Sequence, residues 1–360
     1  MHDFQRLTIS EVRRELPDAI SVALAVPPAL REAYRFKPGQ HLAFRVTLDG
    51  EEFRRTYSIC SGPGEEHLRI AIKRVAGGRF SHWANETLKV GQELEALPPA
   101  GRFILPESDG GSRHIVTFAA GVGITPIIAM VKHALVAEPR TEVTLFYGNR
   151  APDTILFREE LEDLKDRYLG RFALLHVLSR SDTDAPLLKG RIDGAKVKAF
   201  ALKLLRLEDV AHVFLCGPGS MIKEARNALI ELRLPRERIH HEFFAAAGGA
   251  YQTKPEAALP AAVPSGAEAI EVTAVLDGVQ HHFAVLPGEH VVDAAQKAGV
   301  RVPYSCKAGM CCTCRCKLLE GEVTMDANFS LEAWELAAGF VLACQSRPLT
   351  ARVRLDFDQT

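Results

Sequence analysis

Four cysteines near the end of the chain have a spacing that suits a metal cluster. Cys306, Cys311 and Cys314 follow the pattern C-x4-C-x2-C, and Cys344 lies further along the chain. This is the ligand spacing of a [2Fe–2S] cluster, in which four thiolates hold two irons. Gly309 lets the loop wrap closely around the inorganic sulfides, whose charge needs N–H donors. The chain is therefore predicted to transfer single electrons.

Other interpretations of these cysteines exist. Cys311 and Cys314 alone could bind zinc or form a redox dithiol. Zinc usually takes two such pairs or histidines at matching spacing, and Cys344 stands alone, so the cluster is favoured. Cys312 and Cys316 lie off the ligand spacing. They are interpreted as packed thiols that do not bind iron. The alternative is that one of them replaces a neighbouring cysteine as an iron ligand.

A second set of residues has the chemistry that a flavin needs. Arg55, Tyr57 and Ser58 lie in the run RTYS on a predicted strand. They supply a cation for the phosphates, a flat ring against the isoalloxazine and a hydrogen-bond partner near its N5 atom. Strand alternation places Arg55 and Tyr57 on one face and Ser58 on the other. Taken alone, the run would be an ordinary strand with a surface arginine.

The run GGRFS supports the flavin interpretation. Gly77 and Gly78 precede a predicted helix, and Ser81 lies at its start. Free N–H groups at a helix N-terminus form a ready site for phosphate. The simpler interpretation is a plain turn in which Ser81 caps the helix. Because RTYS and GGRFS occur together, a flavin site is the better prediction.

A glycine pair marks a candidate nucleotide site. Gly121 and Gly123 follow a predicted strand at residues 114–118 and open an apolar helix. They would let a pyrophosphate approach closely, and the helix dipole would favour its charge. Pro126 suits the first helical turn, where its missing N–H costs nothing. The pattern departs from G-x-G-x-x-G at its last position, so its place in an alternating strand–helix segment is what supports it.

The run CGPG ends another predicted strand. Cys216, Gly217 and Pro218 follow residues 212–215, and parallel sheets bind ligands at the carboxyl ends of their strands. Cys216 could therefore lie beside a nicotinamide ring, whereas the simpler interpretation is a buried core thiol.

Composition limits the class of protein. The 44 basic and 45 acidic residues nearly cancel, which predicts no general attraction to nucleic acid or to a membrane surface. No apolar stretch reaches the length of a membrane span, and the first ten residues lack an apolar signal core. A thiolate cluster needs a reducing compartment, so we expect a cytoplasmic protein without structural disulfides.

The rhythm of the sequence predicts a multidomain fold. Residues 1–105 contain short alternating strands around one helix, which predicts an antiparallel β-barrel. Residues 106–244 alternate strands and helices, which predicts a Rossmann-like α/β domain with a parallel sheet. Residues 245–268, rich in Ala, Gly and Pro, are interpreted as a linker. Residues 269–360 have the outline of an α+β domain of the β-grasp ferredoxin type.

These motifs together resemble a known family. In this order, RTYS, GGRFS, GVGITP, FYGNR, CGPGSM and the four-cysteine loop resemble the ferredoxin–NADP reductase superfamily fused to a C-terminal plant-type [2Fe–2S] ferredoxin. The resemblance covers essentially the whole chain. Four less generic stretches, at residues 34–41, 190–194, 328–332 and 336–345, are similar to the reductase components of phenylacetyl-CoA epoxidase systems.

The resemblance assigns roles to residues. It implies an FAD site formed by Arg55, Tyr57, Ser58, Gly77, Gly78 and Ser81. It implies a pyridine nucleotide site formed by Gly121, Gly123, Thr125, Pro126, Ser179, Arg180, Gly217 and Pro218. Catalytic roles are implied for Ser58, Cys216 and Glu242, with Phe244 nearby. Glu242 belongs to an E-x-F pattern whose middle position, often basic in relatives, is Phe243 here.

The resemblance also implies an activity. NADPH would reduce FAD, and electrons would pass singly through the cluster to the oxygenase of a multicomponent system. The favoured partner is the di-iron phenylacetyl-CoA epoxidase of aerobic phenylacetate degradation, and a Rieske ring-hydroxylating or steroid-hydroxylating oxygenase is the alternative partner. The guanidinium of Arg180 suits the 2′-phosphate of NADPH; NADH is the alternative donor, and FMN the alternative flavin. A non-enzymatic electron carrier or zinc-stabilised module is disfavoured by three cofactor motifs in one chain.

Overall fold

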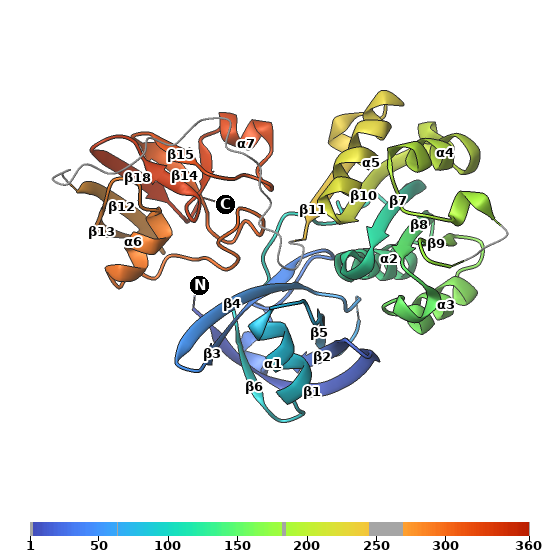
Figure 1. Cartoon of the computed structure of the whole chain (residues 1–360), viewed down its shortest axis with the longest axis horizontal. Coiled ribbons are helices and arrows are strands. Elements are labelled where there is room, and N and C mark those ends of the chain that lie inside the picture. Colours follow the sequence, from blue (N-terminus) through green and yellow to red (C-terminus); the bar gives the residue numbers. More distant parts are fainter. Residues whose placement is uncertain (1–2, 63, 182–184, 245–268, 360) are drawn as a thin grey trace.

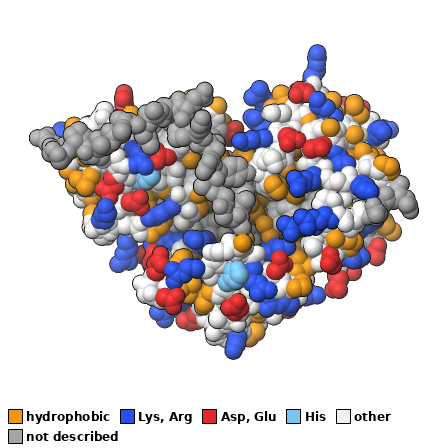
Figure 2. Space-filling model, in the orientation of Figure 1, with side chains coloured by type: hydrophobic (Ala, Val, Ile, Leu, Met, Phe, Trp, Pro, Cys, Tyr) orange, Lys and Arg blue, Asp and Glu red, His pale blue; other side chains and the backbone are white. Residues whose placement is uncertain are grey.

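The computed structural model describes residues 3–62, 64–181, 185–244 and 269–359. The predicted linker lies outside these residues. Three lobes meet around a common junction (Figure 1). We call residues 3–105 the first lobe, 106–244 the second and 269–359 the third. Basic and acidic side chains are interspersed over the face seen in Figure 2, and no helix in the described ranges is long and apolar enough to cross a membrane.

The first lobe is a curled antiparallel sheet, at the bottom of Figure 1. Its six strands have the order β4-β3-β6-β1-β2-β5. The elements are β1 (Gln5–Leu16), β2 (Ala19–Ala25), β3 (His41–Leu48), β4 (Glu51–Ser58), β5 (Leu68–Lys73), α1 (Arg79–Thr87) and β6 (Glu93–Ala96). An isolated bridge between Ile59 and Ile70 links the two edges of the sheet. The expected antiparallel flavin-type fold is confirmed; β6 is the strand that the sequence pattern missed.

The second lobe is a parallel sheet with the strand order β11-β10-β7-β8-β9. Its strands are β7 (Arg113–Ala120), β8 (Thr141–Asn149), β9 (Phe172–Leu178), β10 (Val210–Gly217) and β11 (Ile239–Phe243). Its helices are α2 (Ile124–Ala137), α3 (Arg158–Arg167), α4 (Gly194–Leu204) and α5 (Gly219–Glu231). One hydrophobic core joins the sheet to α2 and α3, and a second joins it to α4 and α5. The expected α/β domain, covered on both faces, is confirmed.

The third lobe is a mixed sheet with the order β13-β12-β18-β14-β16 and a separate pair β15-β17. Its strands are β12 (Ile270–Leu276), β13 (Val279–Val285), β14 (Arg315–Glu320), β15 (Val323–Met325), β16 (Phe340–Leu342), β17 (Ser346–Pro348) and β18 (Arg352–Asp356). Its helices are α6 (Val291–Lys297) and α7 (Ala333–Ala337). The loop that carries the first three cysteines runs between α6 and β14, as the β-grasp prediction requires.

A shared hydrophobic core and a buried charge network join the first two lobes. Phe103 and Leu105 of the first lobe belong to the same buried cluster as the apolar face of α2. Lys132 on α2 is 6% exposed, and its ammonium donates to the carbonyl of Cys60 at 3.1 Å and to Glu65 at 2.6 Å. It also pairs with Glu160, which accepts from Arg69 of β5 at 2.6 Å. These ion pairs cross the boundary in both directions and fix one lobe against the other.

The third lobe contacts the first through aromatic and charged side chains. Glu335 on α7 is 1% exposed. It accepts from Arg315 of its own lobe at 2.8 Å and pairs with Arg102 of the first lobe. At a second contact, the guanidinium of Arg54 lies 3.9 Å from the ring centre of Tyr304. The cluster loop, which begins just after Tyr304, is thereby held against the first lobe.

Replacing Lys132 by Met should loosen the junction of the first two lobes. The substitution leaves Glu65 and the carbonyl of Cys60 without their buried cation, so we expect a loss of stability on the order of 2 kcal/mol. Urea unfolding of the loaded protein, followed by flavin fluorescence, measures it. Lys198→Met is the matched control, because Lys198 pairs with Glu231 on the exposed surface. Equal effects of the two substitutions would contradict the structural role of Lys132.

Candidate functional site

The carboxyl edge of the parallel sheet brings four predicted residues together. Cys216 on β10 pairs with Glu242 on β11 and with Ala119 on β7. Gly121 follows directly after β7. The glycine pair, the thiol and the carboxylate, far apart in sequence, therefore lie side by side where such sheets bind ligands.

The glycine pair has two separate structural reasons. Gly121 has a φ of 54°, a left-handed conformation that favours glycine. A Cβ atom at Gly123 would lie 2.2 Å from the carbonyl oxygen of Cys216. Gly123 is therefore required for packing the start of α2 against β10, which the sequence interpretation did not foresee. The start of α2 has no side-chain cap, so its N–H groups remain suited to a phosphate.

The other predicted nucleotide residues lie around the same edge. Thr125 is buried in the first turn of α2 and donates to the carbonyl of Val122 at 3.0 Å. Pro126 is buried in the same turn, as expected. Pro218 immediately precedes α5, and Gly217 before it has a φ of 154°.

Ser179 and Arg180 extend β9 beyond its carboxyl end. Their N–H groups donate to the carbonyls of Asn149 and Arg150, at 3.0 Å and 2.8 Å. The side chain of Arg180 is exposed. Since β8 and β9 are neighbours in the parallel sheet, this arginine lies on the same edge as the glycine pair, where it is free to meet the outer end of a nucleotide.

The run RTYS occupies the end of β4. Ser58 is 5% exposed, whereas Arg55 is exposed and donates to the carbonyl of Arg54 at 2.7 Å. The ring of Tyr57 lies 6.2 Å from that of Phe44 and 5.6 Å from that of Phe80. Burial raises the pKa of Tyr57 above its ordinary value. The strand thus offers an ordered aromatic ring, a buried hydroxyl and an exposed cation.

The turn GGRFS leads into α1 as predicted, but Ser81 does not cap the helix. Gly78 occupies the cap position, and α1 has no side-chain cap. The hydroxyl of Ser81 accepts from the N–H of Val75 at 3.2 Å and donates to the carbonyl of Gly78 at 3.0 Å. The simpler alternative, a plain turn in which Ser81 caps the helix, is therefore wrong about the cap. Its hydroxyl shapes the turn, and the uncapped N–H groups of α1 are the groups suited to a flavin pyrophosphate.

The residue that sequence reasoning missed is His41, at the start of β3. It lies directly opposite Ser58 of β4, and its Nδ1 is 3.9 Å from Oε1 of Glu242. Burial lowers the pKa of His41 to about 4 and raises that of Glu242 to about 8. Burial, with Glu242 nearby, also raises the pKa of Cys216. The signal available in the sequence for His41 is its place at the end of the stretch at residues 34–41; its position opposite Ser58, the last residue of RTYS, is seen only in the structure.

The four predicted iron ligands form two pairs. Cys306 hydrogen-bonds with Cys311, and Cys314 with Cys344. The N–H of Ala308 donates to Sγ of Cys306 at 3.4 Å. The hydrogen bond from Cys311, together with N–H groups of the loop, lowers the pKa of Cys306 to about 6. Thiols in pairs and loop N–H groups aimed at sulfur fit the needs of a two-iron cluster.

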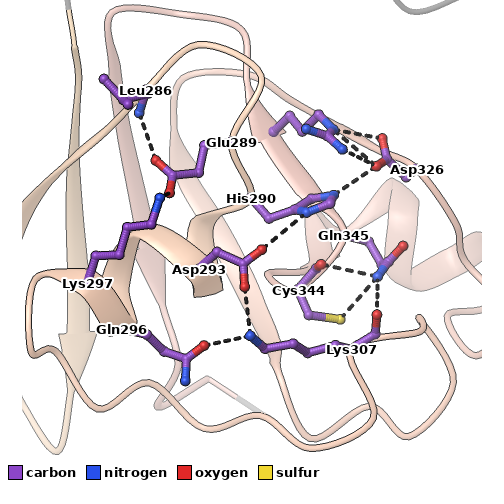
Figure 3. Close-up of polar contacts among 11 residues, drawn as sticks. Leu286, Glu289, His290, Asp293, Gln296, Lys297, Lys307, Asp326, Cys344 and Gln345 are labelled. Carbon is purple, nitrogen blue, oxygen red and sulfur yellow. Dashed lines mark hydrogen bonds and ion pairs between the residues drawn. The ribbon is translucent and has the colours of Figure 1, made fainter.

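Other contacts hold the cluster loop in place. Gln345 donates from Nε2 to the carbonyl of Lys307 at 2.9 Å and to Sγ of Cys344 at 3.6 Å (Figure 3). Gly309 has a φ of 71°, and a Cβ atom there would lie 2.8 Å from the carbonyl oxygen of Ala327. The hydroxyl of Ser305 is buried without a hydrogen-bond partner in the described structure, as a group that faces a cofactor would be.

One of the two cysteines off the ligand spacing lies in a hydrophobic core. Cys316 is fully buried in the hydrophobic core of the third lobe, as expected of a packed thiol.

Each of the three lobes matches the model of a known protein family. Residues 7–104 match the oxidoreductase FAD-binding domain, residues 118–227 the oxidoreductase NAD-binding domain, and residues 274–349 the 2Fe-2S iron-sulfur cluster binding domain. These matches confirm the nucleotide and [2Fe–2S] assignments made from the motifs, and FAD as the flavin that the resemblance implied.

Relatives match the chain over its full length. It is 41% identical over 362 residues to one of the subunits of 1,2-phenylacetyl-CoA epoxidase from Escherichia coli (strain K12), with 99% of each chain covered. It is 33% identical to the ferredoxin reductase component of 3-ketosteroid-9-alpha-monooxygenase of Rhodococcus rhodochrous, covering 98% of this chain and 96% of that protein. Among solved structures, phthalate dioxygenase reductase shares the fold over 98% of both chains, with a TM-score of 0.58 and 24% identity.

Replacing Gly123 by Ala should disturb the nucleotide site. The added methyl group would collide with the carbonyl of Cys216, so α2 must shift at its start, at a cost of about 1–3 kcal/mol. Urea unfolding and the dissociation constant for NADPH measure the two consequences, and both should worsen. Gly170→Ala is the control, because nothing lies within 4 Å of a Cβ atom there. Wild-type values for both quantities in Gly123→Ala would refute this packing requirement.

Proposed function

The chain belongs to the family of FAD- and [2Fe–2S]-containing reductase components of oxygenases, and we propose that it serves a phenylacetyl-CoA epoxidase. The observation that carries the proposal is the 41% identity to a component of such an epoxidase over the full length of both chains. The predicted electron donor is NADPH, the terminal acceptor is the di-iron epoxidase component, and the compartment is the cytoplasm, where thiolates stay reduced.

Three parts of the molecule have separate tasks: the flavin site, the nicotinamide site and the cluster loop. FAD supplies the change from an electron pair to single electrons, which the [2Fe–2S] cluster carries onward. On our proposal, Arg55, Tyr57 and the start of α1 hold the flavin. The buried hydroxyl of Ser58 then forms a hydrogen bond near the reacting edge of the flavin. Cys216 and Glu242 line the place where the nicotinamide meets it.

Contacts between the second and third lobes support transfer within one molecule. Phe243, next to Glu242, lies with its ring 6.1 Å from that of Phe329. The N–H of Phe329 donates to the carbonyl of Gly309 in the cluster loop at 3.0 Å. The nicotinamide side of the site and the cluster loop are thus joined by one aromatic contact and one hydrogen bond.

A steroid-hydroxylating or Rieske oxygenase is the second candidate partner. The ketosteroid monooxygenase component supports it at 33% identity, below the identity to the epoxidase component. The flavin site, the nicotinamide site and the cluster loop would work in the same way with either partner.

The donor preference should depend on Arg180. Replacing Arg180 by Ala removes the proposed charge-assisted contact to the 2′-phosphate, so KM for NADPH should rise about tenfold while KM for NADH stays the same. Steady-state reduction of a dye with each nucleotide measures it. Arg167→Ala, near the end of α3, serves as a surface-arginine control. If Arg180→Ala raised both KM values equally, the residue would have no part in the preference.

Reconstitution tests the proposed partner. The loaded protein, NADPH and a purified phenylacetyl-CoA epoxidase lacking its own reductase should form epoxide from phenylacetyl-CoA, with little product if the reductase is omitted. Replacement of Cys311 by Ser should abolish this product while nucleotide oxidation with an artificial acceptor persists. Full reduction of flavin and cluster by NADPH without epoxide would contradict the epoxidase assignment and favour the second candidate.

A further inference from the structure

We propose that His41 is the positioning residue of the nicotinamide–flavin site, holding the side chain of Glu242 across the boundary between the first two lobes. The inference rests on the reductase function of the family and is independent of which oxygenase the chain serves. It concerns the atoms that lie between Ser58 of β4 and Glu242 of β11.

The imidazole is fixed from its own lobe. The backbone N–H of His41 donates to the backbone carbonyl of Ala100 at 2.9 Å, and the backbone carbonyl of His41 accepts from the N–H of Ala100 at 3.0 Å. Gly101, with a φ of 112°, lies against the ring, and a Cβ atom there would be 2.8 Å from Nδ1. Because Ser58 is the cross-strand partner of His41, the two side chains project to the same face, with Cβ atoms about 5 Å apart.

The same ring faces the other lobe. Nδ1 of His41 lies 3.9 Å from Oε1 of Glu242, and the two side chains are only 4% and 14% exposed. The remaining polar atoms, Nε2 of His41 and Oε2 of Glu242, are buried without hydrogen-bond partners in the described structure. Buried polar atoms without partners are costly. Two of them on one facing pair indicate a site kept for its function rather than for stability.

The surroundings of His41 and Glu242 favour a pair in which neither side chain carries a charge. Burial lowers the pKa of His41 and raises that of Glu242, so near neutral pH the ring is neutral and the acid keeps its proton. Among the residues that the structure describes, the titratable groups that face Glu242 from the packed elements are His41 on β3, Cys216 on β10 and Cys312 in the cluster loop. None of these is a permanent cation that would force the carboxyl to ionise.

This geometry gives His41 a definite task. A protonated Glu242 can donate from Oε1 to a neutral Nδ1, which leaves the proton of the imidazole on Nε2. At 3.9 Å the two atoms are too far apart for a hydrogen bond, so a small shift of either side chain within the fixed junction would form it. The bond would fix the orientation of the carboxyl beside Cys216, where the nucleotide is proposed to bind.

The test compares three variants of the loaded protein. His41→Leu removes the polar ring, and His41→Asn keeps a polar group near the position of Nδ1. His212→Asn is the control, because His212 is a partly buried histidine bonded to His240 at 3.1 Å near the start of β10, away from the site. Each is measured anaerobically for flavin reduction by NADPH between pH 5 and 9, for NADPH affinity and for the flavin midpoint potential. Infrared difference spectra, with Glu242→Gln as reference, follow the protonated carboxyl.

We expect His41→Leu to slow flavin reduction about tenfold at saturating NADPH, while the dissociation constant changes less than about twofold. The carboxyl band should move to the frequency of an acid without a hydrogen-bond acceptor, and the alkaline limb of the pH profile should move to lower pH. His41→Asn should recover part of the rate, and adding Glu242→Gln to His41→Leu should cause little further loss, since the two residues act together.

An unchanged carboxyl band and pH profile in His41→Leu would overturn the proposal, as would equal losses in His41→Leu and His212→Asn. Should His41→Leu not fold, the same readouts in His41→Asn decide the matter: a wild-type band and profile with a slower rate would show a merely structural role. None of these measurements uses an oxygenase, so failure of the epoxidase assignment would be seen separately.

Discussion

The contact between the first lobe and the carboxyl edge of the parallel sheet is the interaction on which the rest of the structure depends. A flavin and a nicotinamide exchange electrons only when their rings meet, so two independently folded lobes must be held in one relative position. A shared hydrophobic core around Phe103 and α2 supplies the buried contact area between the two lobes. The ion pairs of Lys132 with Glu65 and Glu160 fix the position of one lobe relative to the other. His41 and Glu242 face each other across the same boundary between the two lobes.

The third lobe is held in a different way. Its described contacts with the first lobe include the pairing of Arg102 with Glu335 and the stacking of Arg54 on Tyr304, and the hydrophobic core of the third lobe is its own. Charged and aromatic contacts of this kind release more easily than a common core. Such an attachment suits a domain that must receive electrons inside the molecule and also meet a separate oxygenase.

The sequence predicted those parts of the site whose geometry is local. Three of the four predicted cluster ligands come from one short loop, so the spacing of Cys306, Cys311 and Cys314 was informative by itself, and the alternation of strands and helices predicted the parallel sheet. Properties that depend on tertiary contacts were missed. Gly123 is needed because α2 packs on the carbonyl of Cys216. The use of the Ser81 hydroxyl inside its own turn is a local feature that the sequence did not indicate. The proposed role of His41 depends on Glu242, which lies on β11 of the second lobe and faces it only in the folded chain.

The most direct test of the whole account is a single-turnover reduction with less than one equivalent of NADPH, followed anaerobically at several protein concentrations. Flavin bleaching should come first and cluster bleaching second, and the rate of the second step should not depend on protein concentration, because the contact of Phe243 with Phe329 joins both sites in one molecule. A rate of cluster reduction that rises in proportion to protein concentration would show transfer between molecules and contradict the account.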